Sequence, residues 1–169
     1  MKHVLPISVA WLALCCSASL GAANEEPFLK TLAGDWTGHG SMKRTTSSSP
    51  INLDCSFKSR ATGQELSMNG TCRGLIVVSK AVSAEIKTTG SRYAGRYIGP
   101  SGGVSALSGS RAGNAIKLDV RWSKIINGDR NANMTIQRVD DNSIRITTVD
   151  RDPQSGKQVV TSQIDLDRR

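Results

Sequence analysis

Aromatic residues are scarce in this 169-residue chain, at 4% of the sequence, and histidine occurs only twice. His3 lies at the extreme N-terminus, so His39 is the histidine that a folded domain would contain. Ser-His-Asp and Cys-His sites need a histidine as base, and zinc sites need histidine and cysteine at close spacings. The sequence has neither these spacings nor a calcium-loop or phosphate-loop pattern. It therefore predicts a protein that is not an enzyme and that holds no metal or cofactor.

Paired carboxylates can catalyse reactions without histidine, as they do in glycosidases. Asp165 and Asp167 share a strand face, but it is the polar face of the predicted strand. The pair Asp140–Asp141 and the residues Asp150 and Asp152 lie in or beside predicted turns. We therefore expect these acids to be solvated at the surface rather than paired in a catalytic site.

Long hydrophobic runs are also missing, because no stretch reaches the roughly 18 apolar residues of a transmembrane helix. The apolar run Val4–Leu14 follows the positively charged Lys2 and leads to the small residues Gly21–Ala23. This order of charge, short apolar run and small residues is typical of a secretory signal peptide. The prediction is a signal peptide over residues 1–23, cleaved before Asn24.

The remaining residues, 24–169, are then a single exported domain, periplasmic or secreted, with no transmembrane segment. A lipoprotein would instead be cut before Cys15 or Cys16, but that cut needs a small preceding residue. Leu14 precedes Cys15, and Cys16 follows another cysteine. Lipid attachment is therefore the weaker alternative.

Only two cysteines, Cys55 and Cys72, remain after the signal peptide, and two thiols in an oxidising compartment favour a disulfide. Apolar and polar residues alternate on both sides of a turn over Arg60–Glu65, which is typical of two half-buried strands. A hairpin that folds at Gly63–Gln64 places Cys55 opposite Cys72, and both lie on the apolar face. Two metal ligands or a redox pair would be the alternative, but there is no Cys-x-x-Cys spacing and no nearby histidine.

The rest of the domain repeats this alternation between turn signals rich in Gly, Asn and Asp. The predicted fold class is all-β: an antiparallel up-and-down meander of eight to ten strands that closes into a barrel and so hides its edges. Helix is expected only as a short turn over Glu25–Leu32. The stretch Gly74–Lys87 is ambiguous between a strand and a short buried helix. Near the C-terminus, Val160 is expected on the apolar face and Thr161 on the polar face.

The segment Gly34-Asp35-Trp36-Thr37-Gly38-His39-Gly40 follows the predicted helical turn. This opening resembles that of lipocalin-like barrels, and its longer form is similar to that of the nitrobindin branch. The resemblance implies a calycin-like barrel, in which Trp36 plugs the closed end and the glycines let the strand bend. Nitrobindins bind haem through a histidine on a late strand. Here His39 lies on the first strand and on the face opposite Trp36, so haem is not expected.

Four of the six aromatic residues after the signal peptide are candidates for lining a ligand cavity: Trp36, Tyr93, Tyr97 and Trp122. Tyr93 and Tyr97 share a strand face, with Gly95 between them. These side chains either fill the core or surround a small lipophilic ligand. The sequence shows no evident buried charge, so the ligand is expected to be apolar or amphipathic, compact and largely without ionised groups.

The chain is basic, with a formal net charge of +8. Five basic residues are expected on the outer face of the strands: Arg92, Arg96, Lys117, Arg121 and Arg145. The competing hypothesis is therefore an envelope accessory protein that binds an acidic polysaccharide or a protein partner through its exterior. A third hypothesis is an inhibitor that uses the segment Asn24–Phe28. Nucleic acid is not an expected partner, because no recognition motif is present and export separates the chain from it.

Overall fold

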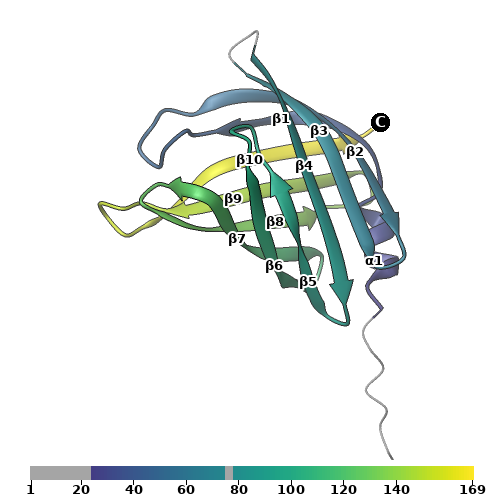
Figure 1. Ribbon diagram of the computed structural model, residues 1–169. Coiled ribbons are helices and arrows are strands. Elements are labelled where there is room, and N and C mark those ends of the chain that lie inside the picture. The colour runs from purple at the N-terminus through teal and green to yellow at the C-terminus, as the bar shows by residue number, and fades with distance from the viewer. Residues whose placement is uncertain (1–23, 75–77) are drawn as a thin grey trace, which may run out of the picture.

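The protein is described here from a computed structural model, which describes residues 24–74 and 78–169. These residues form a short helix, α1 (Glu26–Thr31), and ten antiparallel strands (Figure 1). The strands are β1 (Gly34–Met42), β2 (Ile51–Thr62), β3 (Glu65–Gly74), β4 (Val78–Thr89), β5 (Arg92–Ile98), β6 (Val104–Ala112), β7 (Ala115–Ile126), β8 (Asp129–Arg138), β9 (Ser143–Arg151) and β10 (Gln158–Arg168). Each strand pairs with the next, and β1 also pairs with β10, so the barrel is closed. The predicted all-β meander and its closure are confirmed.

The ambiguous stretch Gly74–Lys87 is a strand wherever it is described. Gly74 ends β3 and Val78 begins β4, whereas residues 75–77 of the apolar run lie outside the described residues. From Val78 the chain pairs with β3 in a regular antiparallel register.

Alternation of side chains puts one face of each strand into the barrel and the other outside, as the pleat of a strand requires. In β7, Ile116, Leu118, Val120 and Trp122 are buried, and the residues between them are exposed. The buried residues of the other strands meet these side chains in one continuous core. Burial of this apolar face is the main stabilising contribution to the fold.

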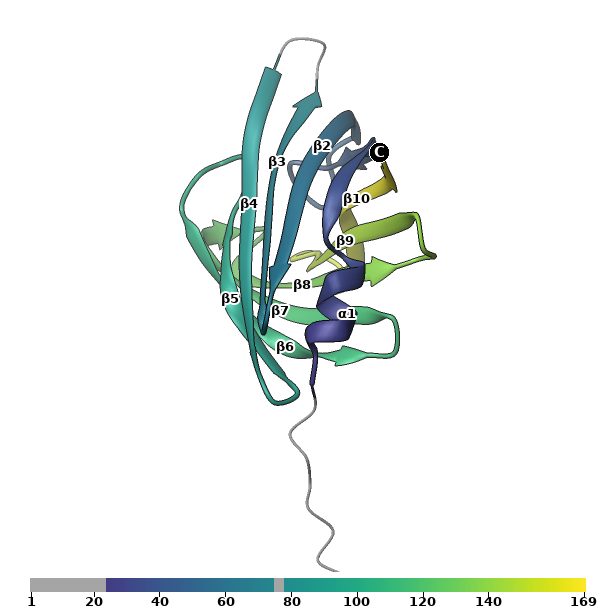
Figure 2. The same ribbon diagram turned by 90° about the vertical axis from the view of Figure 1, so that its right-hand side faces the viewer.

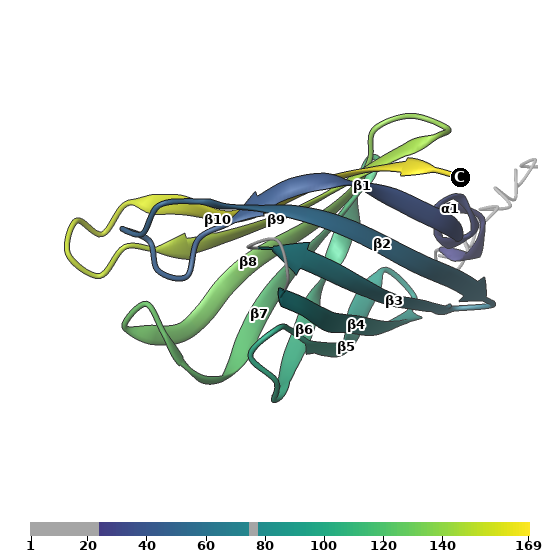
Figure 3. The same cartoon turned by 90° about the horizontal axis from the view of Figure 1, so that it is seen from above.

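The two ends of the barrel differ. Helix α1 and the C-terminus lie at one end, which we call the closed end; Figure 2 looks onto this end, and in Figure 3 both lie at the right. The connections 43–50, 99–103, 127–128 and 152–157 join strands at the other end, the open end. Seen from above, the β1–β2, β7–β8 and β9–β10 connections project together on the side away from α1 (Figure 3). Any access to the interior is therefore expected at the open end.

Strand β1 crosses β10 at close range through its glycines. Gly38 lies opposite Leu166, and a Cβ atom at Gly38 would overlap the backbone carbonyl oxygen of Asp165. A Cβ atom at Gly40 would likewise overlap the backbone carbonyl oxygen of Gln163. Only a residue without a side chain permits this approach, so the glycines of the opening segment allow the two strands that close the barrel to pair.

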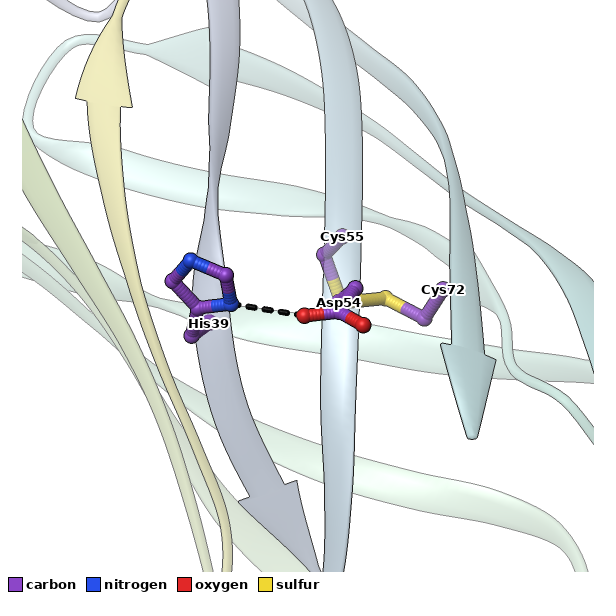
Figure 4. Close-up of a disulfide and its surroundings, with 4 residues drawn as sticks. All are labelled: His39, Asp54, Cys55 and Cys72. Carbon is purple, nitrogen blue, oxygen red and sulfur yellow. Dashed lines mark hydrogen bonds and ion pairs between the residues drawn. A yellow bond between two sulfur atoms is a disulfide. The ribbon is translucent and has the colours of Figure 1, made fainter. Parts of the chain in front are cut away.

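The Cys55–Cys72 disulfide and its hairpin are confirmed. β2 and β3 pair with Cys55 opposite Cys72 and Thr62 opposite Glu65, which is the predicted register. Gly63 in the turn has a φ of 56°, a left-handed conformation that glycine adopts readily. The bridge joins the two strands from the interior face, where both cysteines are buried (Figure 4).

The expectation for Val160 and Thr161 is wrong. Val160 is exposed, whereas Thr161 is buried. The register of β10 against β9 shifts between Val160 and Ser162, which is a β-bulge or a related irregularity. An extra residue in one strand reverses the inward and outward alternation on its far side. Ile164 and Leu166, which follow the shift, are buried as expected.

Candidate ligand-binding cavity

A cavity of about 670 Å³ lies inside the barrel and reaches its open end. The side chains that line its deeper part are apolar: Phe57, Met68, Met134, Ile136 and Ile164. This volume is within the range of about 300–1,000 Å³ typical of small-molecule sites. The two methionines are flexible enough to adapt to ligands of different shape.

The mouth of the cavity is basic. Four cationic residues contribute to its lining and lie near the strand ends at the open end: Lys43, Arg44, Lys80 and Lys124. We call these residues the rim cations. Among the described residues, none of the four takes part in a salt bridge, although salt bridges are frequent elsewhere on the barrel. The mouth therefore presents positive charge above an apolar interior.

Tyr97 and Trp122 come together on the cavity wall. Their ring centroids are 6.2 Å apart with a tilted arrangement, which is a favourable geometry for an aromatic pair. Burial raises the pKa of Tyr97 to about 12, so its phenol stays protonated at neutral pH. A protonated phenol can both donate and accept a hydrogen bond, and this one lies where a ligand would reach it.

Asp150 also lines the cavity, and the expectation that it is solvated is wrong. We expected this acid to be solvated beside a turn, but it lies on β9 and is only 4% exposed. The indole Nε1 of Trp122 donates to Oδ1 at 3.3 Å, and the Thr161 hydroxyl donates to Oδ2 at 2.7 Å. The interior therefore contains a carboxyl group. Asp150 is six residues from the buried Ile144 on β9, and residues an even number apart on a strand share a face. This relation could have predicted that Asp150 faces inward.

The other two aromatic candidates, Trp36 and Tyr93, lie at the closed end and do not line the cavity. Trp36 is buried beneath α1, where its Nε1 donates to the carbonyl of Leu32 at 3.2 Å. The guanidinium of Arg168 lies 4.2 Å from the centre of the Trp36 ring. The structure thus separates the four aromatics into a cavity pair and a pair that closes the barrel.

Tyr93 belongs to a polar cluster with the buried Glu25 and the partly exposed Arg111. The Tyr93 hydroxyl donates to Glu25 at 2.7 Å, and Arg111 donates to the same carboxylate. Glu25 is 3% exposed, and the hydrogen bond from Arg111 lowers the pKa of its carboxyl below the ordinary value, against the opposing effect of burial. Burial and the bond to Glu25 raise the pKa of Tyr93. This cluster fixes the start of α1 and is a structural feature.

His39 lies on the outer wall, as its strand position predicted. Its ring Nδ1 is 2.6 Å from Oδ1 of Asp54, and both side chains are largely exposed (Figure 4). The pair is on the exposed face of β1 and β2, whereas Cys55 and Cys72 are buried on the interior face. Across residues 24–74 and 78–169, no group of three or more His, Cys, Asp or Glu side chains could hold a metal ion.

The basic residues of the outer wall are exposed as expected, but several are engaged. Arg96 pairs with Glu85 at 2.7 Å, and Arg145 pairs with Asp165. Arg121 donates to Asn131 at 3.4 Å. Acids therefore offset the charge of Arg96 and Arg145 on the wall, whereas the rim cations have no such partners among the described residues.

The geometry defines a closed ten-stranded antiparallel barrel with one accessible, mainly apolar interior. Comparison with protein-family models gives no match, and neither does comparison with curated proteins. Among solved structures, the chain is similar to Rv2717c from M. tuberculosis, with a TM-score of 0.63 and 16% sequence identity. The match covers 85% of this chain and 98% of that chain. At this identity the likeness shows the fold alone.

In the described residues, the helix α1 is six residues long, and no helix has the length and apolar character needed to cross a membrane.

Proposed function

We propose that this protein is an exported, non-enzymatic, lipocalin-like barrel that binds a small amphipathic ligand. The observation that carries the proposal is the combination of an apolar cavity of about 670 Å³ with four cationic residues at its mouth. An apolar body enters the interior, because the deeper wall offers it methionine, isoleucine and phenylalanine side chains. An anionic head remains at the mouth beside the rim cations, where water and lysine both stabilise its charge. This differs from the ligand expected from the sequence, which was largely without ionised groups, because the closed barrel brings the rim cations together at the mouth.

The polar groups inside the cavity refine this ligand. The Tyr97 hydroxyl and the Asp150 carboxyl lie in the upper part of the cavity, and both are able to accept a hydrogen bond. A hydroxyl or amide group close to the head of the ligand would satisfy them. The cations that line the cavity lie at its mouth, so the anionic group belongs at the mouth and not deeper.

Titration with a fluorescent polyunsaturated fatty acid tests the proposal, with its methyl ester as the uncharged comparison. We expect one molecule to bind per barrel, and the acid to bind more tightly than the ester. Ala84→Phe fills the cavity from β4 and should abolish binding, because Ala84 is buried and faces the interior opposite Tyr97. Ala94→Phe is the matched control, since Ala94 lies on β5 and faces outward. Equal binding by both variants, or no binding by the unchanged protein, would contradict the proposal.

The second candidate function, recognition of an acidic polysaccharide by the outer wall, has less support. Two of the five wall residues, Arg96 and Arg145, already pair with acids. A salt-sensitive pull-down on an acidic polysaccharide, compared between the unchanged protein and Arg92→Gln with Lys117→Gln, tests it directly. The inhibitor hypothesis is also less favoured, because Glu25 is buried and Asn24 accepts hydrogen bonds from Gln64 and the Glu26 amide.

A further inference from the structure

The exposed apolar side chains of the barrel gather at one end. Six large apolar residues are exposed in the described part of the chain, and five of them lie at the open end: Val78, Ile98, Val104, Ile125 and Val160. We call these five residues the apolar collar. The sixth, Val139, follows β8 at the closed end. Single exposed apolar side chains are ordinary, but gathering at the mouth of a cavity marks an interaction surface.

The collar and the rim cations occupy the same end of the molecule. Val78 begins β4, two residues before Lys80, and Ile125 follows Lys124 on β7. Ile125 is 69% exposed and Val104 is 58% exposed, so packing within the barrel buries neither side chain. Ile98 and Val104 are cross-strand partners on the outer face of β5 and β6, outside the lining of the cavity. The end therefore offers apolar side chains and positive charge together.

This combination fits one partner chemistry best. Protein surfaces that enter a lipid interface insert apolar side chains among the acyl chains and place lysine or arginine at the level of the anionic headgroups. An acidic polysaccharide would use the cations but would leave the isoleucine and valine side chains in water. An apolar protein surface would cover the collar but would bury the lysines without compensation.

We propose that the open end of the barrel docks on an anionic lipid surface, with the apolar collar inserted in the interface and the rim cations beside the phosphates. The inference rests on the proposed function, since it gives an amphipathic ligand a direct path between bilayer and cavity. In this orientation the mouth faces the membrane, and α1 and the closed end face the solvent. The ligand need not cross water with its apolar part exposed.

Vesicle co-sedimentation tests the docking, with residues 24–169 as the protein. These residues contain every strand of the closed barrel, so all strand edges are paired without the preceding segment. Vesicles of phosphatidylglycerol and phosphatidylcholine are compared with vesicles of phosphatidylcholine alone. We expect binding only to the anionic vesicles, weakened as salt rises from about 0.1 to 1 M because the Debye length shortens from about 10 to 3 Å.

Variants separate docking from general attraction between a basic protein and an anionic surface. Ile98→Ser with Val104→Ser should weaken vesicle binding by about tenfold or more, whereas Val139→Ser should leave it unchanged. Lys80→Gln with Lys124→Gln should weaken it by about fivefold for each lysine. Lys117→Gln, on the side wall at β7, should have a much smaller effect. Circular dichroism and thermal unfolding verify that each variant is folded.

The outcomes decide between docking and its alternatives. Absence of binding to the anionic vesicles overturns the proposal. It is also overturned if the side-wall variant weakens binding as much as the rim variants, or if the two lysines matter and the serine pair does not, since charge alone would then explain adsorption. The fatty-acid titration in solution, repeated on Ile98→Ser with Val104→Ser, keeps the two proposals apart. If Ile98→Ser with Val104→Ser loses vesicle binding but keeps fatty-acid binding in solution, both proposals are supported. If the unchanged protein does not bind the fatty acid in solution, only the proposed function is removed.

Discussion

Glu25 and Asp150 show how much a single side chain depends on partners that are distant in the sequence. Glu25 is held by Tyr93 and Arg111, which are 68 and 86 residues away. Asp150 is held by Trp122, 28 residues away, and by Thr161. Carboxylates are rarely buried unless they are paired, and local pattern alone therefore favoured solvent for both. The alternation along β9 could have predicted that Asp150 faces inward, but no local pattern indicated that Glu25 is buried.

At the residue scale, we expect Glu25→Gln to lower the free energy of unfolding by about 1–3 kcal/mol at pH 7, because a buried charge-assisted pair is lost. The neighbouring variant Glu26→Gln is the control. Glu26 pairs only with Lys30 on the surface of α1, so its effect should stay below about 0.5 kcal/mol. Thermal unfolding of the two variants measures the difference, and equal effects would contradict a buried role for Glu25.

The contact between Glu25 and Arg111 also predicts that the stability of the protein depends on pH. Because the folded state lowers the pKa of Glu25, its stabilisation is complete above the ordinary glutamate pKa and is lost as the pH falls through the lower folded value. The difference in melting temperature between the unchanged protein and Glu25→Gln should therefore be largest near neutral pH and should narrow in acid. A difference that stays constant between pH 7 and pH 3 would show that the carboxylate is not the stabilising form.

Hairpins were the elements that the sequence predicted best. The β2–β3 hairpin has its turn, register and disulfide where the alternation and the glycine placed them, because all three are local. The bulge in β10 was missed because Val159 and Val160 are both apolar, so the alternation does not tell which of the two faces inward before the register shift. The division of the aromatics was missed for a different reason. Strand alternation tells which face a residue is on, but not at which end of a barrel it lies.

At the element scale, replacing Cys55 and Cys72 with serine should lower the free energy of unfolding by about 3 kcal/mol on the chain-entropy account. For a chain of this length, that corresponds to a fall of roughly 6–12 °C in the melting temperature. The far-ultraviolet spectrum should stay β-rich, because the strands remain paired. Intact-mass analysis of the unreduced protein should show the mass deficit of one bridge, and two thiols open to alkylation would contradict it.

A second element-scale prediction concerns closure of the barrel. Gly38→Ala should destabilise the protein by about 1–3 kcal/mol, because the added methyl group overlaps the backbone of β10. Gly74→Ala at the end of β3 is the matched control, since the Cβ atom there meets mainly side-chain atoms at 3.1 Å or more. Urea unfolding of both variants compares them. Similar midpoints would argue against a special requirement at the β1–β10 junction.

For the whole molecule, the fold followed from the sequence more completely than the site did. Repeated alternation and turn signals predicted a closed meander. Of the four aromatic candidates for the cavity, Tyr97 and Trp122 are part of its lining. The rim cations were not identified, because Lys43, Arg44, Lys80 and Lys124 are scattered in sequence and meet only when the barrel closes. The signal peptide stays a prediction. N-terminal sequencing of the exported protein should begin at Asn24.

The central claim is that the interior holds an amphipathic ligand, and native mass spectrometry of the exported protein, purified without detergent, tests it most directly. We predict a one-to-one complex whose extra mass is on the order of a few hundred daltons, as expected for a compound that fits a cavity of this size. The Ala94→Phe variant should retain that adduct and Ala84→Phe should lose it. If the unchanged protein and Ala84→Phe both appear at the bare mass, or both carry the same adduct, the cavity is not the binding site and the account is contradicted.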